Sequence, residues 1–228
     1  HKDRPVVVSI DSLIKRYGTI EALSGVSLKL YEGEFIAILG ENGSGKTTLV
    51  KHLNGLLRPD GGSVHVRALD AATAPVIDLV RQTGLVFQNP DTMLFADSVR
   101  DEIMFGLENI GSDSPDRIIT DVLSMVGLSG SEPTYPRHLS RGERQRLAVA
   151  CILAMKPGLI ILDEPTTGLD EKESDKMMDL MLTLQERGHT IIMVTHNMRI
   201  AEEYAGRIIA MENGRVIGDY HNLKGRAS

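Results

Sequence analysis

The stretch Gly40-Glu41-Asn42-Gly43-Ser44-Gly45-Lys46-Thr47 decides how the rest of this sequence is interpreted. Four apolar residues, 36–39, run directly into it, and a helical pattern leaves it and stops at Gly55. A strand, a glycine-rich turn and a helix in this order are the context that a phosphate-binding P-loop requires. Because glycine has no Cβ, consecutive backbone N–H groups can curl around a polyphosphate, and the helix N-terminus adds free donors. The stretch therefore predicts a polyphosphate site.

Two side chains of this loop have separate roles. Lys46 can reach the β and γ phosphates of a nucleotide, and Thr47 can offer its hydroxyl to Mg²⁺. The alternative is a glycine-rich turn with a chance lysine, but the fixed positions of the motif and both flanks match. The predicted nucleotide contacts are Gly40, Asn42, Gly43, Ser44, Gly45, Lys46, Thr47 and Thr48.

The composition is that of an ordinary globular protein. The 228 residues, 42% of them hydrophobic and 25% charged, suffice for one large domain or two small ones. A net charge of −6 argues against a nucleic-acid binder, which usually has a basic face. The single cysteine, Cys151, excludes an internal disulfide framework, and its apolar helical surroundings predict an inert thiol. No stretch approaches the roughly 18 to 20 apolar residues of a membrane span, and the first thirty residues contain no signal-peptide core.

Short apolar segments alternate with helical patterns along most of the chain, which favours a largely parallel α/β sheet. Residues 92–157 differ and are expected to be mostly helical, and residues 208–217 are expected to form a closing hairpin around Asn213-Gly214. We predict strands at residues 6–10, 26–30, 63–66, 85–87, 159–162 and 190–195, and helices at residues 115–126, 140–155 and 171–187.

Three motifs each follow directly after an apolar strand: the P-loop, Asp163-Glu164 and His196. Ligands of parallel sheets bind at the carboxyl ends of the strands, so the three motifs should meet on one edge. Asp163 could hold Mg²⁺ through water, and Glu164 could act on the water that attacks the γ phosphate, as general base or as orienter. Taken alone, the acid pair could instead cap a helix, and His196 could be a turn residue.

The chain carries a series of motifs in a fixed order. They are Tyr17, the P-loop, Gln88, Leu139-Ser140-Arg141-Gly142-Glu143, Asp163-Glu164, Gly168-Leu169-Asp170 and His196. This series resembles that of the nucleotide-binding subunit of an ABC transporter, over essentially the whole length of the chain. The resemblance implies an α/β P-loop NTPase fold of the ABC ATPase type, with an N-terminal antiparallel β subdomain. It also implies one ATP-binding domain, residues 1–228, with a helical signature subdomain at residues 92–157.

Three local phrases narrow the resemblance. They are similar to phrases in the ATPases of energy-coupling-factor importers, which take up vitamins, cobalt or nickel. The phrases are Val86-Phe87-Gln88-Asn89-Pro90-Asp91, Phe105-Gly106-Leu107-Glu108-Asn109 and Leu153-Ala154-Met155-Lys156-Pro157.

The resemblance assigns roles around the nucleotide that spacing alone does not. Tyr17, which alone would be a half-buried turn aromatic, would stack on adenine. Gln88 would contact Mg²⁺ and the attacking water, and the segment after it would contact a membrane partner. His196 would contact the γ phosphate, beside Glu164 as the catalytic carboxylate and Asp163 as the metal ligand.

Other residues would act across a head-to-tail dimer. Ser140 and Gly142, at a helix start, would clamp the γ phosphate of ATP that a second ATPase subunit or domain holds. Asp170 would communicate between the two sites. Residues 139–143 are called the signature below. The family pattern there is Leu-Ser-Gly-Gly-Gln, and here Arg141 and Glu143 stand in place of its third and fifth residues. We expect Glu143 to keep a capping-box geometry and Arg141 to offset its negative charge near the phosphate.

The function that the resemblance implies is Mg-dependent ATP hydrolysis, coupled to transport through an integral membrane component at the cytoplasmic face of the cell membrane. Import of a vitamin or a transition-metal ion is the narrower expectation, with no nucleic-acid partner. The first residue is not methionine and the chain ends soon after Asn213-Gly214, which suggests one half of a tandem ATPase. The alternative is a soluble ABC ATPase that acts as a nucleotide-gated scaffold on the ribosome or on DNA.

Overall fold

The computed structural model describes residues 4–227 and contains two sheets and two groups of helices. The domain expected over residues 1–228 therefore includes four residues, 1–3 and 228, that lie outside the described part. None of the helices within residues 4–227 has the length and hydropathy that crossing a bilayer demands.

The central sheet has six strands in the order β10-β9-β3-β8-β7-β6. Five of them are parallel, and β10 pairs antiparallel with β9 as the predicted hairpin. The prediction of a largely parallel sheet is therefore confirmed. The strands are β3 (Phe35–Leu39), β6 (Thr83–Val86), β7 (Leu159–Asp163), β8 (Thr190–Thr195), β9 (Arg207–Glu212) and β10 (Arg215–His221).

The second sheet is antiparallel, in the order β2-β1-β4-β5, as expected for an N-terminal β subdomain. Its first two strands are longer than the sequence predicted, because a register shift between Ile10 and Leu13, with Ser12 at a φ of 52°, lets pairing continue past a polar interruption. The strands are β1 (Val6–Tyr17), β2 (Ile20–Tyr31), β4 (Gly61–Val66) and β5 (Leu69–Asp70).

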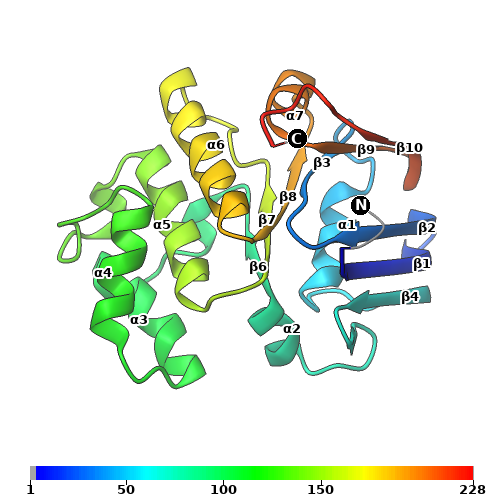
Figure 1. Cartoon of the computed structure of the whole chain (residues 1–228). Coiled ribbons are helices and arrows are strands. Elements are labelled where there is room, and N and C mark those ends of the chain that lie inside the picture. Colours follow the sequence, from blue (N-terminus) through cyan, green and yellow to red (C-terminus); the bar gives the residue numbers. More distant parts are fainter. Residues whose placement is uncertain (1–3, 228) are drawn as a thin grey trace.

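Within residues 4–227, seven α-helices lie around the sheets. Helices α3, α4 and α5 pack into a lobe on one side of the central sheet, and the antiparallel sheet lies on the other side, near α1 (Figure 1). The sequence analysis predicted α1, α4, α5 and α6 but not the two shortest helices, α2 and α7. The helices are α1 (Lys46–Leu53), α2 (Val76–Gln82), α3 (Val99–Ile110), α4 (Pro115–Met125), α5 (Arg141–Ala154), α6 (Glu171–Glu186) and α7 (Met198–Tyr204), with 3₁₀ turns η1 (Pro90–Thr92) and η2 (Pro136–His138).

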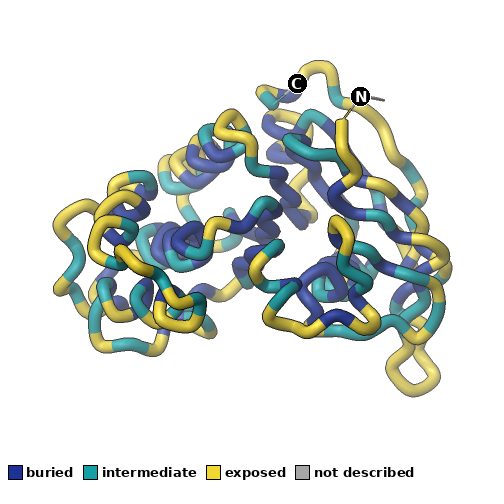
Figure 2. Tube along the Cα trace, turned by 60° about the horizontal axis from the view of Figure 1, so that its bottom comes forward, coloured by how far each residue is buried: buried dark blue, intermediate teal, exposed yellow. Residues whose placement is uncertain are grey.

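Each face of the central sheet has its own hydrophobic core. Along β3, Phe35, Ala37 and Leu39 face the core that the helical lobe, α6 and α7 share. The alternate residues Ile36 and Ile38 face the core of α1 and the antiparallel sheet. Both faces are covered, so the central strands are buried along their whole length (Figure 2). The ends of these strands are therefore held in place by packing on both sides.

Candidate active site

The P-loop wraps around the side chain of its own lysine. Lys46, at the start of α1, donates from Nζ to the carbonyl oxygens of Gly40 at 2.7 Å and of Glu41 at 2.9 Å. Burial lowers the pKa of Lys46, and the carboxylates of Glu164 and Asp163 oppose that shift. The hydroxyl of Ser44 is buried without a hydrogen-bond partner in the described part of the chain. An unsatisfied buried donor beside an ammonium group fits a phosphate oxygen.

Two glycines of the loop have no room for a side chain. A Cβ on Gly40 would lie 2.7 Å from the hydroxyl oxygen of Ser44. Gly45 has a φ of 100°, and a Cβ there would lie 2.7 Å from the carbonyl oxygen of Ala22 on β2. The loop conformation therefore requires glycine at both positions.

The turn between β9 and β10 fastens the loop to the antiparallel sheet. The N–H of Gly214 donates to the carbonyl oxygen of Ser44 at 3.0 Å, and the carbonyl oxygen of Gly214 accepts from the N–H of Ser24 at 2.9 Å. Three segments far apart in the sequence thus meet at the loop. The sequence analysis predicted the turn but not this contact.

Thr47 and Asp163 form the candidate metal site. Thr47, on the first turn of α1, donates its hydroxyl to the Asp163 carboxylate, with oxygen separations of 2.9 and 3.2 Å. Asp163 is the last residue of β7 and is buried. Burial raises the pKa of Asp163, and the hydrogen bond from Thr47 opposes the shift. A hydroxyl and a carboxylate are hard oxygen ligands of the kind that Mg²⁺ prefers, so these residues fit the metal.

Glu164 occupies a strained position directly after the metal ligand. Its φ is 50°, which is uncommon for a residue other than glycine, and Pro165 follows it. Its N–H donates to the carbonyl oxygen of Val194 at 2.9 Å, so the peptide bond is held by β8. Non-glycine residues kept at positive φ by their surroundings cluster at functional sites.

The Glu164 side chain is buried at this edge of the sheet, and polar side chains lie near its carboxylate. His196 Nδ1 lies 2.9 Å from Oε1. The hydroxyls of Thr167 and Thr195 lie 3.4 and 3.5 Å from Oε2. The two threonines were not predicted, and only their positions beside Glu164 and His196 in the sequence could have indicated them.

Tyr17 and Gln88 make no hydrogen bond to this centre, as far as the described residues show. Tyr17 ends β1 and is 49% exposed, with Lys15 Nζ 6.0 Å from its ring centre. Gln88 is exposed just beyond β6, the strand that pairs with β7. Both positions suit contact with a ligand more than contact with the core. Asn42 and Gly43 are likewise exposed.

The signature residues and Asp170 make their contacts at the starts of α5 and α6. Ser140 caps α5 in a capping box: its Oγ accepts from the N–H of Glu143 at 3.3 Å, and Glu143 Oε2 accepts from the N–H of Ser140 at 2.8 Å. Asp170 caps α6 through the N–H of Glu173. Within residues 4–227, no hydrogen bond or ion pair joins Ser140, Gly142 or Asp170 to the P-loop. The structure thus brings together the P-loop, Asp163, Glu164 and His196, and leaves the signature apart.

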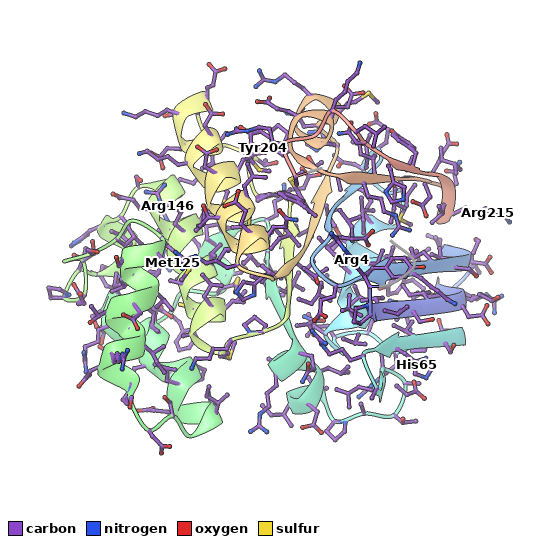
Figure 3. The ribbon with its side chains drawn as sticks, in the orientation of Figure 1. Arg4, His65, Met125, Arg146, Tyr204 and Arg215 are labelled. Atoms are coloured by element: carbon purple, nitrogen blue, oxygen red, sulfur yellow. The ribbon has the colours of Figure 1, made fainter. Side chains whose placement is uncertain are left out.

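Glu173 connects the signature helix to α6. It forms an ion pair with Arg146 of α5, which lies where α5 approaches α6 (Figure 3). A Cβ on Gly142 would overlap the Glu173 carboxylate, so a larger residue there would displace that side chain. The start of α5 is therefore packed against the first turn of α6.

Arg141 does not offset the charge of Glu143, contrary to our expectation. Its Nε donates to the carbonyl oxygen of Thr167 at 3.3 Å, and no ion pair with Glu143 occurs in the described part of the chain. The physical reason is that the capping box turns the Glu143 carboxylate back onto the N–H of Ser140.

Comparisons with known proteins agree with this geometry. The family model described as ABC transporter matches residues 23–167. A putative ABC transporter ATP-binding protein of Methanosarcina acetivorans is 59% identical over 220 residues, which are 96% of this chain and 42% of that protein. The energy-coupling factor transporter ATP-binding protein EcfA of Methanothermobacter thermautotrophicus is 40% identical over 202 residues, covering 87% of this chain and 65% of that protein.

The fold comparison gives the same family. The structure of cbiO1 from Clostridium perfringens, described as part of the ABC transporter complex cbiONQ, superposes with a TM-score of 0.88 at 33% identity, covering 95% of this chain and 88% of that one. The chain spans less than half the length of the Methanosarcina relative. The family model covers more than half of the chain, and both the sequence and the fold are shared with these proteins, so the chain belongs to the ABC transporter family as one of its ATP-binding cassettes.

Proposed function

We propose that this cassette is one half of a tandem ATPase that hydrolyses Mg·ATP to drive import through a membrane component of the energy-coupling-factor type. The observation that carries the proposal is the adjacency of two carboxylates at the end of β7. Asp163 contacts Thr47, and Glu164 contacts His196. These contacts support a metal-binding role for Asp163 and a water-activating role for Glu164. The similarity to EcfA and cbiO1 supports the transporter subtype.

Thr47 and Asp163 would hold Mg²⁺, which supplies charge neutralisation at the phosphates. Lys46 would exchange its contacts with two loop carbonyls for phosphate oxygens. Glu164 would accept a proton from the attacking water or orient it, and His196, whose ring lies against Glu164, would keep that carboxylate in place. Tyr17 would stack on the adenine from the end of β1, and Gln88 would reach the water and the metal from the end of β6.

A second cassette would complete the site. Ser140, Gly142 and Asp170 contact their own helices and not their own P-loop, which leaves them available to a partner. A relative more than twice as long as the matched segment has room for a second cassette in the same chain. A head-to-tail arrangement would place the signature of each half over the nucleotide of the other.

An apolar groove beside the segment after Gln88 supports a membrane partner at the cytoplasmic face. It has a volume of about 470 Å³ and lies between α2, α3 and α5. Phe95 and Phe105 stand at its rim, 68% and 52% exposed, with ring centres 5.0 Å apart. Exposed aromatic residues around a concave surface are typical of a protein interface.

The first test is whether the rate of ATP hydrolysis depends on a second cassette. The rate of ATP hydrolysis per chain should rise with protein concentration, because each site lacks a signature until two cassettes meet. Glu164→Gln should keep ATP binding, lower turnover by about 100-fold or more, as removal of a general base does, and accumulate an ATP-bound dimer. ATPase assays and size-exclusion chromatography measure both. Turnover by a monomer that is independent of concentration contradicts the shared site, and unchanged turnover in the variant removes Glu164 from the mechanism.

A further inference from the structure

Three arginines at the start of α5 each reach a different neighbouring segment. Arg144 forms an ion pair with Asp91 of η1, just after Gln88, and Arg146 pairs with Glu173 of α6. Arg141 reaches the loop that follows Glu164. It stands where the family pattern has glycine, which could not make this contact.

The guanidinium of Arg141 lies directly against the backbone of residues 167–168. Its Nε donates to the carbonyl oxygen of Thr167 at 3.3 Å. Gly168 has a φ of 76°, and a Cβ there would lie 2.9 Å from that same Nε and 3.1 Å from Cζ. The close approach depends on glycine at 168, so the two positions fit each other.

Thr167 in turn contacts the catalytic carboxylate. Its N–H donates to the carbonyl oxygen of Glu164 at 3.2 Å, and its hydroxyl lies 3.4 Å from Glu164 Oε2. One residue therefore separates Arg141, in the signature, from Glu164. Glu164 also sits at a strained φ of 50°, so its conformation depends on neighbouring contacts such as those of Thr167.

We propose that Arg141 is a positioning residue that couples the two ATP sites of the dimer through Thr167. The signature of one cassette engages the nucleotide of its partner, whereas Glu164 of the same cassette acts on its own nucleotide. Movement of the signature would pass through the Arg141–Thr167 hydrogen bond to Glu164. By reciprocity, the state of each site would then influence the other. The inference rests on the proposed function, since it requires a second cassette.

The test compares two substitutions of Arg141, one that removes the hydrogen-bond donor to Thr167 and one that keeps a donor. Arg141→Met keeps a chain that reaches as far as Nε and removes the donor, whereas Arg141→Gln keeps an N–H group the same number of bonds from Cα as Nε. Loss of one hydrogen bond predicts a decrease in kcat of about three- to ten-fold for the methionine variant. The KM for ATP should stay unchanged, because Arg141 does not contact its own nucleotide site. The Hill coefficient for ATP should fall towards 1, and the glutamine variant should restore both values.

Thr167→Val tests the second step. It removes the hydroxyl that faces Glu164 and should reproduce the loss of kcat and of cooperativity. Combined with Arg141→Met it should add little, since both changes interrupt one pathway. Thr167→Ser keeps the hydroxyl and should behave as the wild type. Arg117→Met changes an exposed arginine of α4 and is the matched control, with unchanged kcat and Hill coefficient.

The outcomes separate this inference from the proposed function. A wild-type chain that hydrolyses no ATP, or does so as a monomer, contradicts the proposed function. A wild-type dimer with a Hill coefficient of 1 contradicts only the coupling. So does a glutamine variant as impaired as the methionine variant, a loss that appears in KM instead of kcat, or a double variant whose losses simply multiply.

Discussion

At the scale of single residues, Asp163 combines a buried carboxylate with one hydroxyl donor, Thr47. Burial raises its pKa above the ordinary value of 3.8. The folded chain therefore binds more protons than the unfolded chain over an interval above 3.8, and folding stability falls as the pH rises through that interval. At neutral pH, the carboxylate that would hold the metal opposes folding of the nucleotide-free protein.

Asp163→Asn should consequently stabilise the nucleotide-free chain while abolishing Mg-dependent hydrolysis. Asparagine keeps the shape and an acceptor for Thr47 but carries no charge. We expect a Tm higher by about 2–4 °C at pH 7.5, and this gain should shrink as the pH falls towards 4. Thermal denaturation between pH 4 and 8 measures the gain, with the exposed Asp113→Asn as a control that leaves Tm unchanged. A gain that does not vary with pH would mean that charge burial is not its cause.

Sequence alone could predict that Asp163-Glu164 follows a buried strand, because the apolar run before it has the length of a strand. It could not predict the φ of Glu164, since that angle depends on the hydrogen bond from its N–H to Val194 on the neighbouring strand. Sequence alone could not predict where the Arg141 side chain points either. A long side chain selects among several neighbours, and the nearest acceptor lies 26 residues away in sequence.

At the scale of elements, a buried ion pair joins the starts of β3 and β9. Arg207 NH1 lies 3.0 Å from Oε2 of Glu34, and both side chains are almost fully buried. Arg207 also forms two hydrogen bonds of 2.8 Å with Asp219 of β10. Glu34 accepts a further bond from the N–H of Tyr31 at the end of β2. The pair therefore connects four strands, β2, β3, β9 and β10, at the end of β3 that lies opposite the P-loop.

Arg207→Met should lower the free energy of unfolding by about 3–5 kcal/mol, because it leaves Glu34 buried without its cation. Adding Glu34→Gln should recover much of that loss, since the uncompensated charge disappears. Urea denaturation measures the three values. The matched control is Arg67→Met, which breaks the exposed Arg67–Glu32 pair and should cost about 1 kcal/mol or less. Equal losses for the buried and the exposed pair would contradict the argument.

The elements that sequence analysis missed share one property, which is shortness. Helix α2 buries only Leu79 of its seven residues, and α7 also has seven, so neither shows two full turns of apolar periodicity. The longer helices were predictable because their apolar faces repeat and their ends have recognisable caps, such as Ser140 for α5 and Gly188 after α6. The strand predicted at residues 6–10 was too short. It ended before Asp11-Ser12 because these residues are polar, but a bulge there lets β1 continue to pair with β2.

At the scale of the whole molecule, the turn between β9 and β10 connects the end of the chain to the phosphate-binding loop near its start. Gly214→Ala should weaken ATP binding, because φ is 73° there and a Cβ would lie 2.6 Å from the carbonyl oxygen of Ala22. A strain of about 1–3 kcal/mol corresponds to a loss of affinity between about five- and 150-fold if it is relieved by moving the loop.

Binding of a fluorescent ATP analogue measures this affinity. The control is Gly130→Ala, in the helical lobe, where φ is 80° but no atom lies within 4 Å of the added Cβ. That variant adopts an equally unfavourable backbone angle without touching the loop, so its affinity for ATP should stay at the wild-type value. A Gly214→Ala chain that binds ATP as tightly as the wild type would show that the turn does not support the P-loop.

The hydrogen bonds of Gly214 also bear on when the P-loop can reach its final conformation during synthesis of the chain. Ser44 leaves the ribosome early, but the N–H that fixes its carbonyl belongs to a residue made near the end, as does β9, the strand that pairs with β3. A nascent chain halted before β9 therefore presents a phosphate loop with one neighbouring strand missing and one anchor unmade. We therefore expect the loop to reach the conformation described here only after residues 207–214 have been synthesised.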